Sequence, residues 1–94
     1  MVDIKEKHLT IVKEILKKYS YTFYVYGSRA KKKARKNSDL DLCYKEKIPG
    51  KVISSIKEQF EESDLPFKVD IVSWENMSPT FQKLIEKDLV VLTH

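Results

Sequence analysis

The stretch that decides the fold is FYVYGSRAKKKARKNSDLDL, residues 23–42. Its aromatic and β-branched start stops at Gly27-Ser28, which is typical of a strand that ends in a turn. At the other end two carboxylates alternate with leucines, so Asp39 and Asp41 lie on one face of a second strand, about 7 Å apart along the backbone. A turn suited to phosphate and a pair of carboxylates suited to metals indicate chemistry on a nucleotide.

A cluster of cations lies between the turn and the carboxylates. Its six members are Arg29, Lys31, Lys32, Lys33, Arg35 and Lys36. The net charge of the chain is +4, so these six positive charges leave −2 for the remainder. Proteins that coat nucleic acid usually spread their cations over a larger face. The local cluster therefore favours a discrete phosphate group as the ligand and makes a nucleic-acid partner the weaker interpretation.

Length and composition limit the architecture. A chain of 94 residues, 41% of them apolar and only two of them glycine, predicts one globular domain over residues 1–94. The lone cysteine, Cys43, cannot form an internal disulfide, which favours a reducing compartment. No apolar run approaches the ~20 residues that span a bilayer, and the N-terminus has no signal-peptide pattern. We therefore expect a cytoplasmic protein without a membrane partner.

Apolar spacing and helix-forming composition predict alternating helices and strands. We expect helices over residues 3–19, 28–34, 51–62 and from 79 onward, and strands over 22–26, 40–44, 67–73 and 89–92. Ser78-Pro79 has the composition of a helix start, an N-cap serine followed by proline. This order predicts an α+β fold with two layers, in which a small mixed β-sheet of three to four strands carries helices packed on one face.

A third carboxylate, Asp70, interrupts the apolar strand FKVDIV of residues 67–72. Burial of an unpaired carboxylate there would be costly, and a metal ion or another cation would compensate it. Two carboxylates on one strand and one on another form a plausible site for two divalent ions. Oxygen ligands of this kind suit Mg²⁺, with Mn²⁺ as an alternative. Such a pair of ions is suited to phosphoryl or nucleotidyl transfer.

Gly27-Ser28 supplies the other half of the expected site. A glycine at the end of a strand lets the backbone approach a ligand without a Cβ in the way. The N-terminus of the helix expected over 28–34 would present free N–H groups to a phosphate, and the hydroxyl of Ser28 would add a hydrogen bond. The loop lacks the lysine spacing of a P-loop and the Gly-x-Gly-x-x-Gly pattern.

The spacing of these parts, Gly27-Ser28, ten residues, Asp39-x-Asp41 and a later strand aspartate, resembles the minimal nucleotidyltransferases of the DNA polymerase β-like nucleotidyltransferase superfamily. The resemblance implies the palm fold of that superfamily. It also implies that Gly27 and Ser28 hold the triphosphate, with Arg29 assisting at the phosphates. Asp39 and Asp41 would bind both metal ions, and Asp70 would complete the catalytic ion and help to deprotonate the acceptor hydroxyl.

The resemblance further implies ATP as the nucleotide and the transfer of AMP to a hydroxyl of a partner protein. Small members typically pair with a helical HEPN-type protein, often as the antitoxin of a toxin–antitoxin system. Two other interpretations stay open: a non-catalytic module that neutralises such a partner by occlusion, and a nucleic-acid-binding domain. Tyr26 and Trp74 are interpreted as packing at the edge of the core, with contact to the base as the alternative.

Several properties are not decided by the residues. The base specificity, the acceptor hydroxyl, activity without a partner and self-association into a homo-oligomer all stay open. The same holds for the individual roles of five cations of the cluster, Lys31, Lys32, Lys33, Arg35 and Lys36.

Overall fold

The structure is a computed structural model, and it describes residues 2–31 and 38–93. The elements follow one another in the expected order, apart from the segment between the first two strands. They are α1 (Glu6–Leu16), β1 (Phe23–Tyr26), β2 (Leu40–Tyr44), α2 (Gly50–Glu61), β3 (Val69–Ser73), the short 3₁₀ helix η1 (Trp74–Asn76), α3 (Pro79–Glu86) and β4 (Val90–Thr93).

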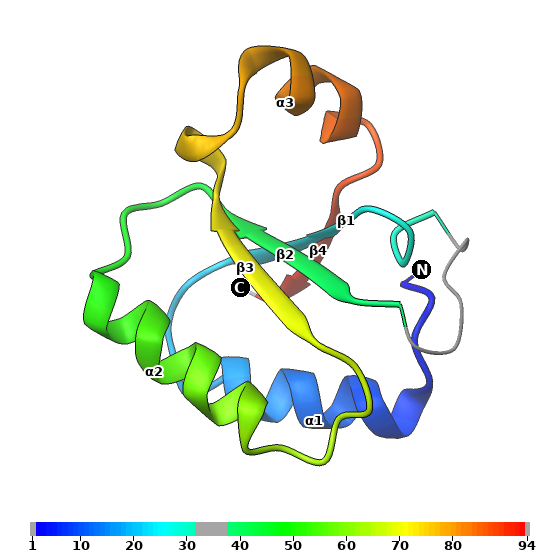
Figure 1. The fold of residues 1–94 in the computed structure, drawn as a ribbon, viewed down its shortest axis with the longest axis vertical. Helices are drawn as coiled ribbons and strands as arrows, with labels where there is room; N and C mark the ends of the chain where they lie inside the picture. The colour runs from blue at the N-terminus through cyan, green and yellow to red at the C-terminus, as the bar shows by residue number, and fades with distance from the viewer. Residues whose placement is uncertain (1, 32–37, 94) are drawn as a thin grey trace.

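The strands form one mixed sheet in the order β3-β2-β1-β4. The central strand β1 is antiparallel to both of its neighbours, β2 and β4. The strands β2 and β3 are parallel, and α2 makes the crossover that a parallel pair needs. This mixed four-stranded sheet with three helices confirms the predicted α+β fold class. Figure 1 shows the sheet lying between α1 and α2 at one side and α3 at the other.

The main core lies between the sheet and the pair α1 and α2. Every second side chain along a strand points into this core, so Val25 and Leu42 are completely buried there. The two helices add apolar residues at helical spacing from the other side. The buried members of this core are Val12, Ile15, Leu16, Phe23, Val25, Leu40, Leu42, Ile53, Ile56, Phe60 and Ile71.

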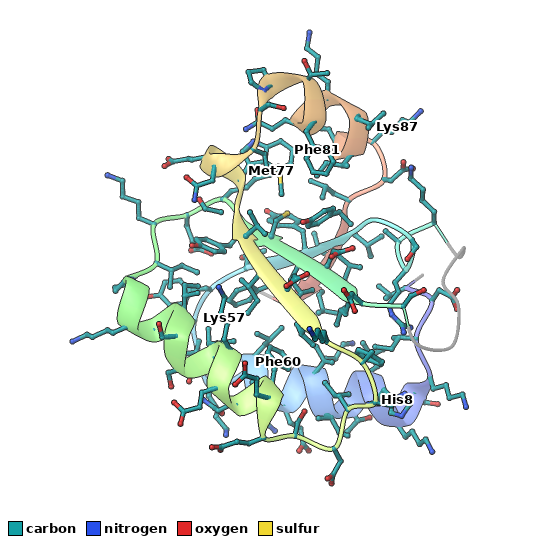
Figure 2. The ribbon with its side chains drawn as sticks, in the orientation of Figure 1. His8, Lys57, Phe60, Met77, Phe81 and Lys87 are labelled. Carbon is teal, nitrogen blue, oxygen red and sulfur yellow. The ribbon has the colours of Figure 1, made fainter. Side chains whose placement is uncertain are left out.

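The third helix does not join this layer, so the prediction that the helices pack on one face holds only for α1 and α2. A second, smaller cluster of Cys43, Met77 and Ile85 includes the strand positions that face away from the main core. Tyr24, Tyr26 and Val72 pack against that cluster, which means that the second face of the sheet is also partly apolar and needs a cover. Figure 2 shows Met77 and Phe81 on the side of the sheet where α3 lies.

The segment after β1 also differs from the prediction of a helix over residues 28–34. Residues 28–31 form a turn, in which the carbonyls of Gly27 and Ser28 accept hydrogen bonds from the N–H groups three residues later. Residues 32–34 lie outside the described residues. The first helix is shorter than the predicted 3–19, since the N–H of Asp3 bonds to the carbonyl of Arg29 (2.7 Å) and residues 17–18 form a turn. The predicted start of α3 is confirmed: the Ser78 hydroxyl accepts from the N–H of Phe81.

The helices of residues 2–31 and 38–93 are all too short or too polar to cross a membrane. Cys43 has a free thiol, and its side chain is completely buried in the second cluster, with Met77 and Ile85. Burial raises the pKa of this thiol to about 11, although the Lys45 ammonium acts in the opposite direction. Cys43 is therefore a packing residue, as expected for a small apolar side chain in a strand.

The packing around β2 gives a direct test of the fold. Leu42 is completely buried in the main core, so Leu42→Ala should lower the free energy of unfolding by about 2–5 kcal/mol. Leu84→Ala is the matched control, because that leucine is 60% exposed and its truncation should change stability by no more than about 0.5 kcal/mol. Urea unfolding followed by circular dichroism measures both. Equal effects of the two substitutions would contradict the assigned core.

Candidate active site

The carboxylate of Asp41 lies directly against the backbone of Gly27. Tyr26, the last residue of β1, is the register partner of Asp41 on β2, so the turn at Gly27 passes beside that carboxylate. A Cβ added to Gly27 would lie 2.7 Å from the Asp41 Oδ2 atom, closer than real Cβ contacts. Gly27 also has a φ of +79°, which L side chains rarely adopt. Glycine is therefore required at this position both by its backbone conformation and by the space that Asp41 needs.

Asp70 lies beside Asp41 across the parallel pair of strands. The two residues are register partners of β3 and β2, so their side chains point to the same face of the sheet. The sequence argument expected Asp70 to be buried and in need of compensation, and this was wrong, because its side chain is exposed. The reason is that β3 is an edge strand and α1 and α2 cover only the other face.

The electrostatics of Asp41 reveal an excess of negative charge. Its pKa is raised above the usual value, first by partial burial and then by the carboxylates of Asp70 and Asp39. The shift shows that Asp39, although exposed, is close enough to act on its neighbour. In this arrangement the carboxylates repel one another, and a cation between them would relieve the repulsion.

The carboxylates fit a divalent cation by their chemistry. Asp39, Asp41 and Asp70 offer only oxygen donors, and Gly27 leaves the space beside Asp41 free of side-chain atoms. Within residues 2–31 and 38–93, no three His, Cys, Asp or Glu side chains are already drawn together as a metal site. The ion would therefore draw in carboxylates that the strand register has brought to one face.

Tyr26 forms an apolar wall next to the carboxylates. Its ring packs edge to face on Phe81 of α3, with 6.0 Å between the ring centroids. Burial raises the pKa of its hydroxyl to about 12, with further contributions from Asp41, Cys43 and Asp70. The hydroxyl is therefore protonated at neutral pH and able to donate a hydrogen bond at the site. The sequence pattern left its role open between packing and ligand contact, and its place beside Asp41 is compatible with both.

The aromatic residues further from the carboxylates have partners within the chain. The Lys45 ammonium lies 4.8 Å from the ring centroid of Trp74 and 5.0 Å from that of Tyr24. Trp74 is thereby engaged at the edge of the second cluster, which agrees with the packing interpretation. The His8 ring packs edge to face on the ring of Phe67.

The structure places the other predicted site residues in different surroundings. Ser28 is half-buried in the turn next to Gly27, and its carbonyl accepts a hydrogen bond from the N–H of Lys31. Arg29 points into the protein and is only 5% exposed. Lys31 is exposed and forms an ion pair with Asp88 at 3.6 Å. The remaining cations of the cluster, Lys32, Lys33, Arg35 and Lys36, lie outside the described residues.

Comparison with known proteins shows the family to which the chain belongs. Residues 2–94 match the family model described as "Polymerase beta, Nucleotidyltransferase". The chain belongs to the polymerase beta nucleotidyltransferase family. It is an enzyme of the nucleotidyltransferase class, and the turn at Gly27 and the carboxylates on β2 and β3 form the candidate active site of this nucleotidyltransferase.

Two known proteins resemble the chain closely enough to describe. The Haemophilus influenzae protein "Probable protein adenylyltransferase MntA" (strain ATCC 51907 / DSM 11121 / KW20 / Rd) is 43% identical over 95 residues, which cover 97% of this chain and 83% of the relative. Among solved structures, a crystal structure of a toxin–antitoxin with AMP-PNP has a TM-score of 0.66 at 16% identity. The match covers 90% of this chain and 72% of that one. At this identity, the solved structure supports the fold alone.

The contact between Gly27 and Asp41 predicts a selective effect of one methyl group. Gly27→Ala should destabilise the protein by at least about 1–2 kcal/mol through its positive φ, with further loss from the contact with Oδ2. It should also abolish nucleotidyl transfer, because Asp41 must move. Gly50→Ala is the matched control, since a Cβ there has nothing within 4 Å. That control should be neutral or stabilising by about 0.4–1 kcal/mol. Full activity of Gly27→Ala would contradict the arrangement.

The raised pKa of Asp41 predicts how stability depends on pH. A carboxyl whose pKa is raised on folding binds its proton more tightly in the folded state, so its contribution to stability falls as the pH rises past its ordinary value. Asp41→Asn removes that loss. The variant should therefore gain stability relative to wild type between acidic and neutral pH, measured by thermal unfolding without divalent ions. Asp64→Asn, on the loop after α2, controls for the loss of one negative charge. A constant difference across this pH range would contradict the prediction.

Proposed function

We propose that the chain is a Mg²⁺-dependent nucleotidyltransferase that moves AMP from ATP to a hydroxyl group of a partner protein. The observation that carries the proposal is the register of Asp41 with Asp70, directly beside the bare backbone of Gly27. This arrangement places Gly27, which has no side chain, next to carboxylates that need a cation. Both features suit a metal-bound triphosphate.

Each residue has a distinct role in the proposal. The N–H groups and the hydroxyl at Gly27-Ser28 bind the triphosphate, which can come close because Gly27 has no Cβ. Asp39 and Asp41 hold two Mg²⁺ ions, or Mn²⁺ in their place, and Asp70 completes the set for one of them. When bound, such ions lower the pKa of the attacking hydroxyl and stabilise the leaving oxygen.

The proposed reaction is a single displacement at the α-phosphorus of ATP. The acceptor oxygen forms a bond to that phosphorus while the bond to the bridging oxygen of the β-phosphate breaks, so pyrophosphate leaves. Asp70 takes the proton of the acceptor hydroxyl. The exposure of Asp70 on an edge strand supports this role, because an acceptor on another molecule can reach it from solvent.

The surface next to the carboxylates supports a protein as the acceptor. Within the described residues, the large apolar side chains that are exposed are Phe81, Leu84 and Val91. Phe81 packs on Tyr26, which links this apolar surface to the candidate active site. The name of the Haemophilus influenzae relative, a probable protein adenylyltransferase, supports the same acceptor class.

The proposed partner is a helical HEPN-type protein, and the chain would be the antitoxin of such a pair. The resemblance of the Gly-Ser and Asp-x-Asp spacing to the minimal nucleotidyltransferases, which typically pair with such proteins, supports this. The proposed location is the cytoplasm, where ATP is available and a free thiol such as that of Cys43 persists. Self-association into a homo-oligomer stays open.

The nucleic-acid interpretation loses support in the structure. Two members of the cation cluster are engaged within the chain, Arg29 by burial and Lys31 by its ion pair with Asp88. Neutralisation by occlusion alone would use the exposed apolar surface without any need for the carboxylates. The experiment below separates catalysis from occlusion.

The test is transfer of label from ATP to the purified partner protein. Label at the α-phosphate should appear on the partner only with Mg²⁺ or Mn²⁺, whereas label at the γ-phosphate should leave as pyrophosphate. An Asp39→Asn/Asp41→Asn double variant should lose more than about 100-fold in rate. Substitution of residues that only orient metal ligands already lowers metal affinity or activity by about 10–100-fold. Asp64→Asn serves as the matched control and should keep the wild-type rate.

Three outcomes would count against the proposal. Transfer of the γ-label would show phosphoryl transfer in place of nucleotidyl transfer. An unchanged rate in a correctly folded double variant would refute the role of the carboxylates. A double variant that neutralises its partner as well as wild type would favour occlusion as the physiological function.

A further inference from the structure

Arg29 is the one charged residue in the buried class among the residues that the structure describes, with 5% of its surface exposed. It directly follows Gly27-Ser28 in the chain. The resemblance to known nucleotidyltransferases implies that it assists at the phosphates. A buried guanidinium is costly unless its N–H groups are hydrogen-bonded. Its bonding partners therefore show what the side chain is used for.

The guanidinium bonds to the main chain of two distant segments. Nε and Nη2 both donate to the carbonyl of Ser38, at 3.1 and 2.7 Å. Nη1 donates to the carbonyl of Asp3 at 2.8 Å, and the N–H of Asp3 donates in return to the carbonyl of Arg29. The carbon at the centre of the guanidinium lies 4.2 Å from the ring centroid of Phe67, a stacked cation–π contact.

The contacts of Arg29 with Ser38 and Phe67 join the turn after Gly27 to the segments that lead into β2 and β3. Ser38 directly precedes Asp39, so its carbonyl fixes the point at which the chain enters β2. The next residue but one, Leu40, donates its N–H to the carbonyl of Lys68 at 2.8 Å, which joins that point to the start of the strand of Asp70. Phe67, under the guanidinium, immediately precedes Lys68.

The geometry of the contacts needs an arginine. One carbonyl accepts from two nitrogens of the planar fork while a third nitrogen bonds to a separate segment, and the flat face stacks on a ring. A lysine has the charge but neither the fork nor the flat face. With these N–H groups committed to main-chain carbonyls and the side chain buried, little of the guanidinium remains available to a triphosphate.

We infer that Arg29 is a positioning residue, which holds the Gly27 turn, the Asp39 end of β2 and the start of β3 in the geometry that binds the metal ions. The inference rests on the proposed function and deepens it. Arg29 acts through the carboxylates and makes no contact with the nucleotide. A residue that contacts phosphate by charge would behave differently on substitution, and this difference makes the inference testable.

The experiment compares Arg29→Lys and Arg29→Met in the full chain by Mn²⁺ affinity without nucleotide, followed by electron paramagnetic resonance. Loss of positioning should weaken Mn²⁺ binding about 10–100-fold in both variants, as residues that orient metal ligands do. In the transfer assay, kcat should fall in both variants while the KM for ATP changes less. Lys51→Gln, which removes an exposed cation at the start of α2, is the matched control and should change neither quantity.

A role of Arg29 as a phosphate contact predicts the opposite pattern. Mn²⁺ affinity without nucleotide would then be the same as wild type in both variants. The KM for ATP would rise in Arg29→Met and be largely rescued in Arg29→Lys, because lysine preserves the charge. That pattern would overturn the inference while leaving the proposed function intact. If wild type itself binds no Mn²⁺, the proposed function fails as well.

A second pair of variants keeps the test decisive if the Arg29 variants do not fold. Phe67→Leu removes the ring under the guanidinium while leaving its charge and hydrogen bonds in place, and Phe67→Tyr keeps the ring. Phe67→Leu should weaken Mn²⁺ binding by several-fold, and Phe67→Tyr should restore it. Wild-type Mn²⁺ affinity in a folded Phe67→Leu variant would contradict the inference.

Discussion

The contact between the bare backbone of Gly27 and the carboxylate of Asp41 is the constraint on which the site depends. The antiparallel pairing of β1 and β2 brings the two residues together. The backbone of Gly27 fits beside the carboxylate because glycine adopts the positive φ and has no Cβ. The parallel pairing of β2 and β3 then places Asp70 beside Asp41. Hydrogen bonding between strands therefore brings the glycine turn and two carboxylates together from residues 27, 41 and 70.

This assembly places carboxylates close enough to repel one another, which is unfavourable without a compensating cation. Partial burial raises the pKa of Asp41, and the neighbouring carboxylates of Asp70 and Asp39 raise it further. The rest of the molecule offsets the repulsion with two separate apolar clusters, one on each face of the sheet. The smaller cluster under α3 leaves the Asp70 side of the second face open to solvent. Another molecule can therefore reach Asp70 from that side.

The sequence predicted the strands and the faces of their side chains, because the alternation of apolar and polar residues is a local signal. Alternation assigned Leu40 and Leu42 to the core and Asp41 to the opposite face, and the structure agrees. What could not be predicted depends on tertiary contacts. Asp70 was chosen by its supposed burial, whereas its proximity to Asp41 comes from strand register on an open edge. The inward turn of Arg29 depends on carbonyls of Asp3 and Ser38. Local composition carries no signal for either.

Metal and triphosphate should meet between the Gly27 turn and the carboxylates on β2 and β3. Paramagnetic broadening of backbone amide signals in two-dimensional NMR, on addition of Mn²⁺ and AMP-PNP, measures this position residue by residue. The account predicts that the signals of Gly27, Asp41 and Asp70 broaden first, while those of the middle of α2 persist. Broadening centred on the acidic end of α2, at Glu61 and Glu62, with the Gly27 and Asp41 signals unchanged, would contradict it.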